Sequence, residues 1–394
     1  MSAAEDSGRR RRLPPVVLGL GLVSLLTDAA SEMVFPFLPE LVKTLGGDKR
    51  ALGLIEGLAD AVAAFLRLVA GRLTDHSGRR RPFVLAGYSL SAVVRPCVAL
   101  ATATWHVLAV RVVDRVGKGL RGAPRDALIA AAVAPERRGE AFGFHRAMDH
   151  AGAVIGPILA LLVLQFVTED LRTLFWLAAI PGAFAIATAA RHAREQAFPT
   201  APPAKAERAP ARALAGFLLP LSLFTLGRGN DVFLLALVSD DRGSLSELPL
   251  LWIGLHLVRS STATLGGRLA DRHGHVVAIA LGWLVHVAAY GALAVTDDRL
   301  VVRALFLGYG LHAGLSEGAE KALVARIAPS RRWGAAFGWY HFAAGLVALL
   351  ASLGFGALWD VQGRAVAFGT SAALAAVATM WLWVQRQRIG APGL

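Results

Sequence analysis

The sequence predicts an all-α integral membrane protein in which twelve transmembrane helices form two six-helix bundles. Three observations carry this prediction. The 394 residues are 55% hydrophobic and 18% charged, with a mean hydropathy of +0.52, which is too apolar for a chain that must present its surface to water. The apolar residues gather in stretches long enough to cross ~30 Å of hydrocarbon. Short motifs of the first half also recur in the second half.

The apolar stretches predict the individual spans, each long enough to cross the bilayer with some tilt. We expect them at about 14–43, 51–73, 82–103, 105–132, 140–167, 171–190, 213–238, 248–270, 276–296, 299–327, 334–358 and 364–384. The first stretch is long and contains Asp28 and Glu32. It is therefore a better first transmembrane helix than a signal peptide.

Lysine and arginine are concentrated in alternate loops. Arginine clusters follow the second, fourth and tenth spans, at Arg79–Arg81, Arg137–Arg138 and Arg331–Arg332, whereas the intervening loops are short and mixed or acidic. Such a bias marks cytoplasmic loops, so both termini are expected in the cytoplasm of a multi-pass plasma (inner) membrane protein. The net charge of +13 is then a topology signal and implies no nucleic-acid partner. Cys97 is the single cysteine, which excludes an intramolecular disulfide.

The chain repeats itself on either side of a polar, proline-containing stretch. The segment 71–75 (GRLTD) recurs as 267–271 (GRLAD), and 134–138 (APERR) recurs as 328–332 (APSRR). We expect an N-terminal bundle over 1–190, a cytoplasmic linker over 191–212 and a C-terminal bundle over 213–394, related by a pseudo-twofold axis. Parallel repeats of this kind place a substrate site near the midplane, between the halves.

The fourth span carries a stripe of charge. If this span is helical, one arc of roughly 140° contains seven ionisable residues, which are Arg111, Asp114, Arg115, Lys118, Arg121, Arg125 and Asp126. Charges facing lipid are costly, so the stripe must face protein or a hydrated cavity. Counter-charges are available on the first span (Asp28, Glu32), the second (Glu56, Asp60) and the fifth (His145, Asp149). The balance of charges leaves the sign of the substrate open.

The loop from Gly71 to Arg80 resembles the loop signature of the major facilitator superfamily, and the resemblance extends over essentially the whole chain. It implies a conformational switch built from Gly71, Asp75, Gly78 and Arg79, which holds one closed conformation and releases it during transport. Arg121 or Arg125 of the fourth span is a candidate partner for Asp75.

The fifth span is similar to the signature of the drug–proton antiporter branch of that family, which exports its substrates. Gly143, Gly152, Gly156 and Pro157 carry the similarity, whereas Ala160 and Leu161 stand where that branch has two glycines. The same glycines could instead form a packing face with no bearing on direction. The segment 111–114 (RVVD) is similar to an arginine motif that the branch associates with proton transfer.

The resemblance implies a secondary transporter that exports a small organic or drug-like compound in exchange for protons, by alternating access of the two halves. Asp28 or Glu32 is expected to carry the proton, with Arg111, Asp114 and Lys118 as tuning partners. Further candidates for the cavity are His145, Asp149, Arg228, Asp231, Glu317 and His341. Glu317 and Lys321 are also spaced to pair along one helix.

Two alternatives remain open: a divalent metal-cation exporter, suggested by histidines within spans, and a metabolite or anion symporter. The histidines lack the spacing typical of a metal site, so we expect no metal centre. Gly117 to Gly122 fit G-x-G-x-x-G but lie inside a membrane span, so no nucleotide cofactor is expected. No constellation of an enzyme is present. The expected partners are the small-molecule substrate, protons and membrane lipid, and the resemblance implies a monomer.

Overall fold

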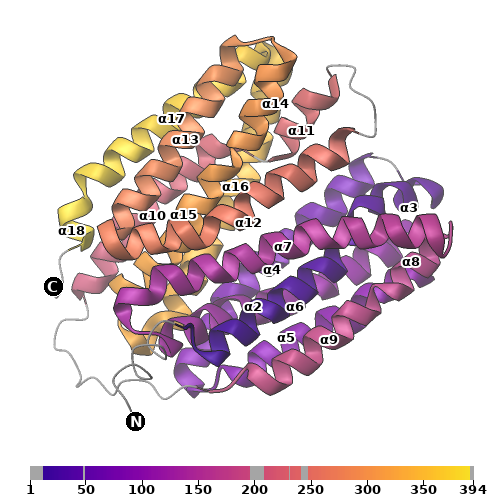
Figure 1. Ribbon diagram of the computed structural model, residues 1–394, viewed down its shortest axis with the longest axis horizontal. Helices are drawn as coiled ribbons and strands as arrows, with labels where there is room; N and C mark the ends of the chain where they lie inside the picture. Colours follow the sequence, from indigo (N-terminus) through magenta and orange to yellow (C-terminus); the bar gives the residue numbers. More distant parts are fainter. Residues whose placement is uncertain (1–11, 48, 196–207, 230, 241–246, 391–394) are drawn as a thin grey trace.

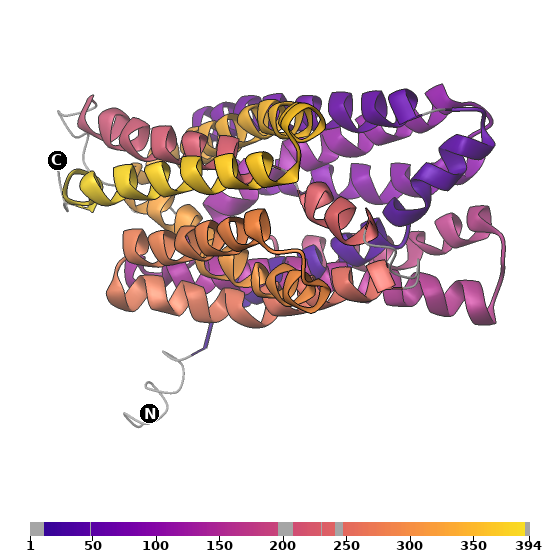
Figure 2. The same cartoon turned by 90° about the horizontal axis from the view of Figure 1, so that it is seen from above.

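A computed structural model describes residues 12–47, 49–195, 208–229, 231–240 and 247–390. The protein has the predicted fold, with twelve transmembrane segments in two six-helix bundles. Figure 1 shows the first bundle in indigo to magenta beside the second bundle in orange and yellow. In the orthogonal view the helices run along the long axis of the molecule (Figure 2). Part of the predicted linker, 196–207, lies outside the described residues.

The first bundle begins with α2 (Pro15–Glu32), which continues through η1 (Phe35–Phe37) and α3 (Leu38–Thr44). Its remaining elements are α4 (Lys49–Ser77), α5 (Arg81–Val94) with η2 (Arg95–Leu100), α6 (Thr104–Ala132), η3 (Pro135–Arg137) with α7 (Arg138–Phe166), and α8 (Leu171–Leu177) with α9 (Ala179–His192).

The second bundle begins with α10 (Arg208–Arg228) and α11 (Asp231–Asp240). It continues with α12 (Glu247–His273), α13 (His275–Val295), α14 (Arg299–Gly308) with α15 (Gly310–Ile327), η4 (Ser330–Arg332) with α16 (Trp333–Gln362), α17 (Arg364–Val384) and the short α18 (Arg386–Gly390).

Some predicted spans are built from two helices rather than one. The seventh span breaks between α10 and α11, where Gly229 has a φ of +66°, a conformation that glycine adopts without steric cost. The tenth span changes helix at Tyr309. By contrast, α7 runs through Pro157 without interruption. The first, seventh and tenth spans each include a short helix, α3, α11 or α14, and Figure 1 shows these three on the side of the molecule away from α18.

Seven of the described helical segments are long and apolar enough to cross a membrane by composition alone. The other spans include α4 and α6, which carry the predicted charges. Within α6, Arg111, Asp114, Arg121 and Asp126 are all buried, so the stripe faces protein as the cost of charge in lipid requires. The polar spans therefore hide their charges between neighbouring helices.

The two bundles touch at one end of the molecule, where α4 ends and α16 begins; we call it the closed end. Here α7 lies along α12 and α4 lies along α16. A Cβ atom on Gly71 would collide with the carbonyl oxygen of Gly334, and one on Gly139 would collide with that of Gly267. Glycine at these positions lets the backbones of the two bundles meet directly.

The apolar cores show the same asymmetry. One cluster at the closed end combines both bundles, with Phe142 and Phe337 in contact at a centroid distance of 5.7 Å. Toward the opposite end the described residues form two separate clusters, one around Phe175 in the first bundle and one around Phe368 in the second. In the part of the chain that the structure describes, the bundles therefore share a core only at the closed end.

Candidate functional site

A cavity of about 360 Å³ lies between the two bundles, at the lower end of the range for small-molecule sites. It is lined by α2, α4, α5, α6 and α7 of the first bundle and by α10, α15 and α16 of the second. Its ionisable lining residues are Asp28, Arg67, Tyr88, Lys118, Arg121, Arg125, Arg146, Asp149, Arg228, Glu317, Glu320, Lys321, Tyr340 and His341.

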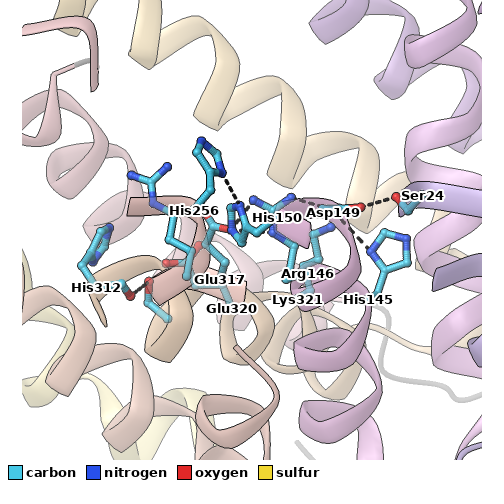
Figure 3. Close-up of polar contacts among 12 residues, drawn as sticks. Ser24, His145, Arg146, Asp149, His150, His256, His312, Glu317, Glu320 and Lys321 are labelled. Carbon is cyan, nitrogen blue, oxygen red and sulfur yellow. Dashed lines mark hydrogen bonds and ion pairs between the residues drawn. The ribbon is translucent and has the colours of Figure 1, made fainter. Parts of the chain in front are cut away.

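Arg146 joins the two bundles at the cavity. Its guanidinium donates to Asp149 at 2.7 Å on its own helix, α7, and to Glu317 of α15 across the interface. Asp149 also accepts a hydrogen bond from Ser24 of α2, and His150 Nε2 lies 3.5 Å from Glu317. Figure 3 shows these side chains as one row from α2 to α15. Separation of the bundles along this row would break the Arg146–Glu317 pair.

Asp126 forms a second link between the bundles. The side chain is fully buried at the end of the α6 stripe, beside Arg125 at 3.0 Å. Across the interface it contacts Lys321 of α15 at 3.1 Å and His341 of α16 at 2.8 Å. A buried carboxylate with a cation on each side is the arrangement that offsets its desolvation cost.

The pair expected within α15 does not form. Glu317 binds Arg146 and Lys321 binds Asp126, so each side chain of the i, i+4 pair turns to the other bundle. An exposed i, i+4 pair contributes only about 0.2–0.5 kcal/mol. A side chain that is already buried has lost its hydration. A counter-charge packed against it therefore stabilises it more than an exposed pair would.

The structure brings six of the eleven predicted cavity residues together. Asp28, Lys118, Asp149, Arg228, Glu317 and His341 line the cavity, and so do Arg121 and Arg125. The other five do not line it. Three of them form ion pairs outside the cavity: Arg111 with Glu56 at 2.6 Å, Asp114 with Arg95 at 3.0 Å and Asp231 with Arg259 at 2.8 Å. Glu32 lies one turn beyond Asp28, and His145 packs behind Asp149.

Two carboxyl groups of the cavity have no ion pair with any described residue, namely Asp28 and Glu320. Glu320 accepts hydrogen bonds from Trp283 Nε1 at 3.2 Å and from Tyr340 Oη at 2.9 Å, both neutral donors. Sequence reasoning did not select Glu320. The available signal was its position one turn from Glu317, on the same face of α15.

The partner proposed for Asp75 from sequence is wrong. Arg121 donates to Ser91 Oγ at 2.7 Å, and Arg125 pairs with Asp126, so neither contacts Asp75. The Asp75 carboxylate instead accepts the backbone N–H groups of Gly334 and Ala335, at 2.9 and 2.7 Å, and pairs with Arg80. The reason is position: Gly122 of α6 packs against Arg67, two turns of α4 away from Asp75.

The second copy of the motif makes the same contact in the opposite direction. Asp271 accepts the backbone N–H groups of Gly139 and Glu140, at 2.8 and 2.7 Å. Each aspartate thus caps the first turn of a helix in the other bundle. Burial raises the pKa of Asp75, and it raises the pKa of Asp271 to about 6, although the two N–H donors oppose the shift in each case.

The glycines of the fifth span pack on two sides of α7. A Cβ atom on Gly152 would lie 2.5 Å from the Leu25 carbonyl oxygen, and one on Gly156 would lie 2.6 Å from that of Ala29. Gly143 faces the second bundle, against the backbone of Ala263. The motif therefore allows close approach both within the first bundle and across the interface.

Two glycines of the G-x-G-x-x-G segment lie at contacts between helices. Gly117 lies against Gly87 of α5, and Gly119 lies against Ala63 and Leu66 of α4. Among the histidines, His150 and His256 meet across the interface, with 3.2 Å between their Nδ1 atoms. Within the described part of the chain, no group of three or more His, Cys, Asp or Glu side chains is arranged to hold a metal ion.

A charged cavity between two membrane bundles that meet at one end defines a membrane transporter. The Major Facilitator Superfamily model matches residues 20–240, and the chain belongs to that family. It is 28% identical to an uncharacterized MFS-type transporter of Methanocaldococcus jannaschii, over 89% of this chain and 90% of the relative. It is 30% identical to an uncharacterized protein of Mycobacterium tuberculosis, over 87% and 86%.

Other known proteins are similar to this chain over part of its sequence, or in fold alone. The multidrug resistance protein MdtH of Photorhabdus laumondii is 31% identical over 42% of this chain and 40% of its own. The human organic anion transporter MFSD10 superposes with a TM-score of 0.80 at 17% identity, covering 93% of this chain and 99% of that chain. A bacterial homologue of the iron transporter ferroportin gives 0.73 at 16%, covering 94% and 98%.

Proposed function

We propose that this transporter exports a small organic compound in exchange for protons. The observation that carries the proposal is a cavity shared by both bundles, in which Asp28 and Glu320 lack ion-pair partners among the described residues. A carboxyl group without a fixed cation can take up and release a proton without first breaking an ion pair. The compound and the proton would then use neighbouring parts of one cavity.

The two bundles are proposed to move as units over 1–190 and 213–394, joined by the linker 191–212. The basic loops support a cytoplasmic position for the closed end and for both termini, in the plasma (inner) membrane. The conformation is then closed toward the cytoplasm and opens outward. Two observations on the described residues support this conformation: the bundles share an apolar core at the closed end, and they have separate cores at the other end.

Proton coupling is proposed to involve Asp28, with Lys118 beside it in the cavity and Glu32 one turn away. Opening of the closed end must separate Arg146 from Glu317, because they lie on different bundles. Arg146 would then be free to change its distance from the carboxyl groups of the first bundle. A cation that moves with the bundles links proton affinity to the direction in which the cavity opens.

The direction of export is supported by two likenesses. The Gly143-to-Pro157 segment is similar to the signature of the drug–proton antiporter branch, and part of the chain is similar to the multidrug resistance protein MdtH. Gly143 lies at the moving interface itself, against Ala263, where a larger residue would interfere with closure.

The test uses purified protein in proteoliposomes that contain a pH-sensitive dye. Antibiotics, dyes, metabolites and divalent ions are added outside, one at a time, and the internal pH is followed. We expect at least one organic compound, as it enters the vesicles, to cause protons to move in the opposite direction. Asp28→Asn or Glu320→Gln should abolish this proton movement. Proton movement in the same direction as the compound would replace antiport by symport. Movement unchanged in both variants and in Glu32→Gln would reject the coupling assignment.

One observation favours a second candidate, a divalent metal-cation exporter. The Nδ1 atoms of His150 and His256 are 3.2 Å apart, a separation that a metal ion bound by two imidazoles at about 2.1 Å allows. A bacterial homologue of ferroportin is also among the proteins of similar fold. In the same assay, proton movement caused by a divalent ion and lost in His256→Gln would favour this candidate.

A further inference from the structure

We propose that the transported compound is an organic anion, bound between Arg67 and Lys118 of the first bundle and Arg228 of the second. The proposal rests on transport through the cavity described above, and it adds the charge of the substrate. Sequence alone left that charge open, because acids and bases nearly cancel along the spans. The structure separates the charges that face the cavity from those that pair elsewhere.

Cations outnumber carboxylates in the lining. Among the described residues, seven lysine and arginine side chains line the cavity against four carboxylates. Asp126, directly behind Arg125 and Lys321, adds a fifth carboxylate, and the excess is still positive. Proton binding to Asp28 or Glu320 would increase the excess further. A cavity with low-dielectric walls and one dominant sign of charge attracts ligands of the opposite sign.

Four of the seven cations already have partners. Arg125 and Lys321 bind Asp126, and Arg146 binds Asp149 and Glu317. Arg121 donates to the Ser91 hydroxyl at 2.7 Å and to the Gly87 carbonyl oxygen at 3.2 Å, and it lies over the Tyr88 ring at 4.6 Å.

Arg67, Lys118 and Arg228 remain without a hydrogen bond or an ion pair to any described residue. The Nε atom of Arg67 is buried and has no hydrogen-bond partner in the described part of the chain. A desolvated cation without a directly bound partner is costly, and an anionic ligand in contact with it would lower that cost. The three lie on α4, α6 and α10 and line one cavity, so an anion held by a cation from each bundle would contact both bundles.

The same cavity has an apolar side. Leu221 and Phe224 of α10 line it together with Ala344 and Ala348 of α16. Apolar walls with a few placed charges are typical of sites for organic compounds rather than for bare inorganic ions. The volume of about 360 Å³ suits a small carboxylate, sulfonate or phosphate monoester with one ring or a short chain. An anion that leaves while a proton enters moves positive charge inward in both steps, so an inside-negative potential would drive the exchange.

The potential of the cavity can be measured without knowing the substrate. Cys97→Ser removes the single native thiol, and Ala348→Cys places one in the wall of the cavity. We would compare its modification rates by a negatively charged and a positively charged methanethiosulfonate reagent. Relative to a simple thiol in solution, the ratio of anionic to cationic rate should rise on the order of tenfold or more, because a positive potential of only about 1 kT per unit charge raises one rate and lowers the other by about threefold each.

Variants that remove single charges test whether the named residues cause the change in the ratio of modification rates. Arg67→Gln, Lys118→Gln and Arg228→Gln should each lower the rate ratio several-fold. The matched control is Arg388→Gln, which removes an exposed arginine on α18 away from the cavity and should leave the ratio unchanged. A ratio at or below that of the free thiol overturns the proposal, as does an equal effect of the cavity variants and the control.

Three probes of similar shape then test binding. Benzenesulfonate, benzyl alcohol and benzyltrimethylammonium differ mainly in charge, and each is tested for protection of the cysteine of Ala348→Cys. We expect protection by benzenesulfonate alone, lost in Arg228→Gln. Protection by the cation or the alcohol to the same degree, or by none of the three, contradicts the anion assignment. A positive cavity that binds benzenesulfonate, in a protein that moves no protons with any compound, would reject proton coupling and leave the anion assignment standing.

Discussion

Asp271 and Gly139 lie in different bundles, and the Asp271 carboxylate accepts the Gly139 N–H at 2.8 Å. The contact has a counterpart in the Asp75 carboxylate, which accepts the Gly334 N–H at 2.9 Å. Each aspartate belongs to one copy of the repeated G-R-L-x-D segment, and each glycine lies in the first turn of a long helix of the other bundle. The closed end is therefore held by two equivalent contacts.

Removal of either aspartate should weaken the closed end. Asp75→Ala or Asp271→Ala leaves two N–H groups of a helix terminus without their acceptor, which costs about 1–3 kcal/mol. We expect the open population to rise roughly tenfold per variant, as follows from 1.4 kcal/mol per factor of ten, and more in the double variant. Distances between spin labels at Ser77 and Ser330, across the closed end, measure this population.

Asp170→Ala is the matched control for that measurement. Asp170 caps α8 through the N–H groups of Arg172 and Thr173, within one bundle and at the opposite end. It should change the distance distribution little. Equal effects of Asp170→Ala and Asp271→Ala would show that general destabilisation, and not loss of the contact between Asp271 and the other bundle, opens the molecule.

The closed end should also respond to pH. In the closed arrangement burial raises the pKa of Asp271 to about 6, whereas a water-exposed aspartate titrates near about 3.9. The closed form therefore binds the proton more tightly, so acidification from pH 7 toward 4 favours closure, and the benefit is lost as pH rises through about 6. The label distances at Ser77 and Ser330, measured against pH, should shift toward the closed value in acid. The response should shrink in Asp271→Ala; a shift toward the open value would contradict the assignment.

Close backbone contact at the closed end predicts a steric effect. In Gly71→Ala the new methyl group would collide with the Gly334 carbonyl oxygen, so the bundles could not close fully. Gly57→Ala, on the same helix α4, places its methyl group in open space. We expect Gly71→Ala to reduce the closed population and the turnover in proteoliposomes, and Gly57→Ala to preserve both. Normal closure in Gly71→Ala would mean that the bundles do not meet at this glycine.

The buried Asp126 cluster predicts a non-additive effect on stability. Asp126→Asn leaves Arg125 and Lys321 buried without their counter-charge and should cost about 3–5 kcal/mol. Lys321→Gln added to it removes one of the orphaned cations, so the double variant should be more stable than Asp126→Asn alone. Thermal unfolding in detergent gives the comparison. Additive losses would indicate that Asp126 and Lys321 do not interact.

Much of the fold could be predicted from sequence because the repeat and the apolar stretches are properties of the residues themselves. The helix break at Gly229 could not, since isolated glycines inside an apolar stretch do not reveal their φ angle. The buried side of α6 was predictable from the positions of Arg111 to Asp126, because charge in lipid is excluded on general grounds.

The pairing within the site was harder to predict. An arginine was expected opposite Asp75, because charged side chains stand out in a sequence, whereas the actual partners are backbone N–H groups that every residue but proline carries. Glu317 and Lys321 illustrate the same limit: their spacing predicts a pair, but the opposing bundle provides better partners for both. Sequence names the charges, and only packing between the bundles decides which remain unpaired in the cavity.

In the proposed transport cycle, one cavity between the bundles is exposed to the two sides of the membrane in turn. This alternation is tested most directly by modification of Ala348→Cys, in the Cys97→Ser background, with an impermeant thiol reagent applied to one side at a time. We expect modification from the side away from the termini, and additional modification from the terminal side once Asp75→Ala and Asp271→Ala are introduced. Modification from the terminal side alone, or side preference unaffected by loss of both aspartates, would contradict it.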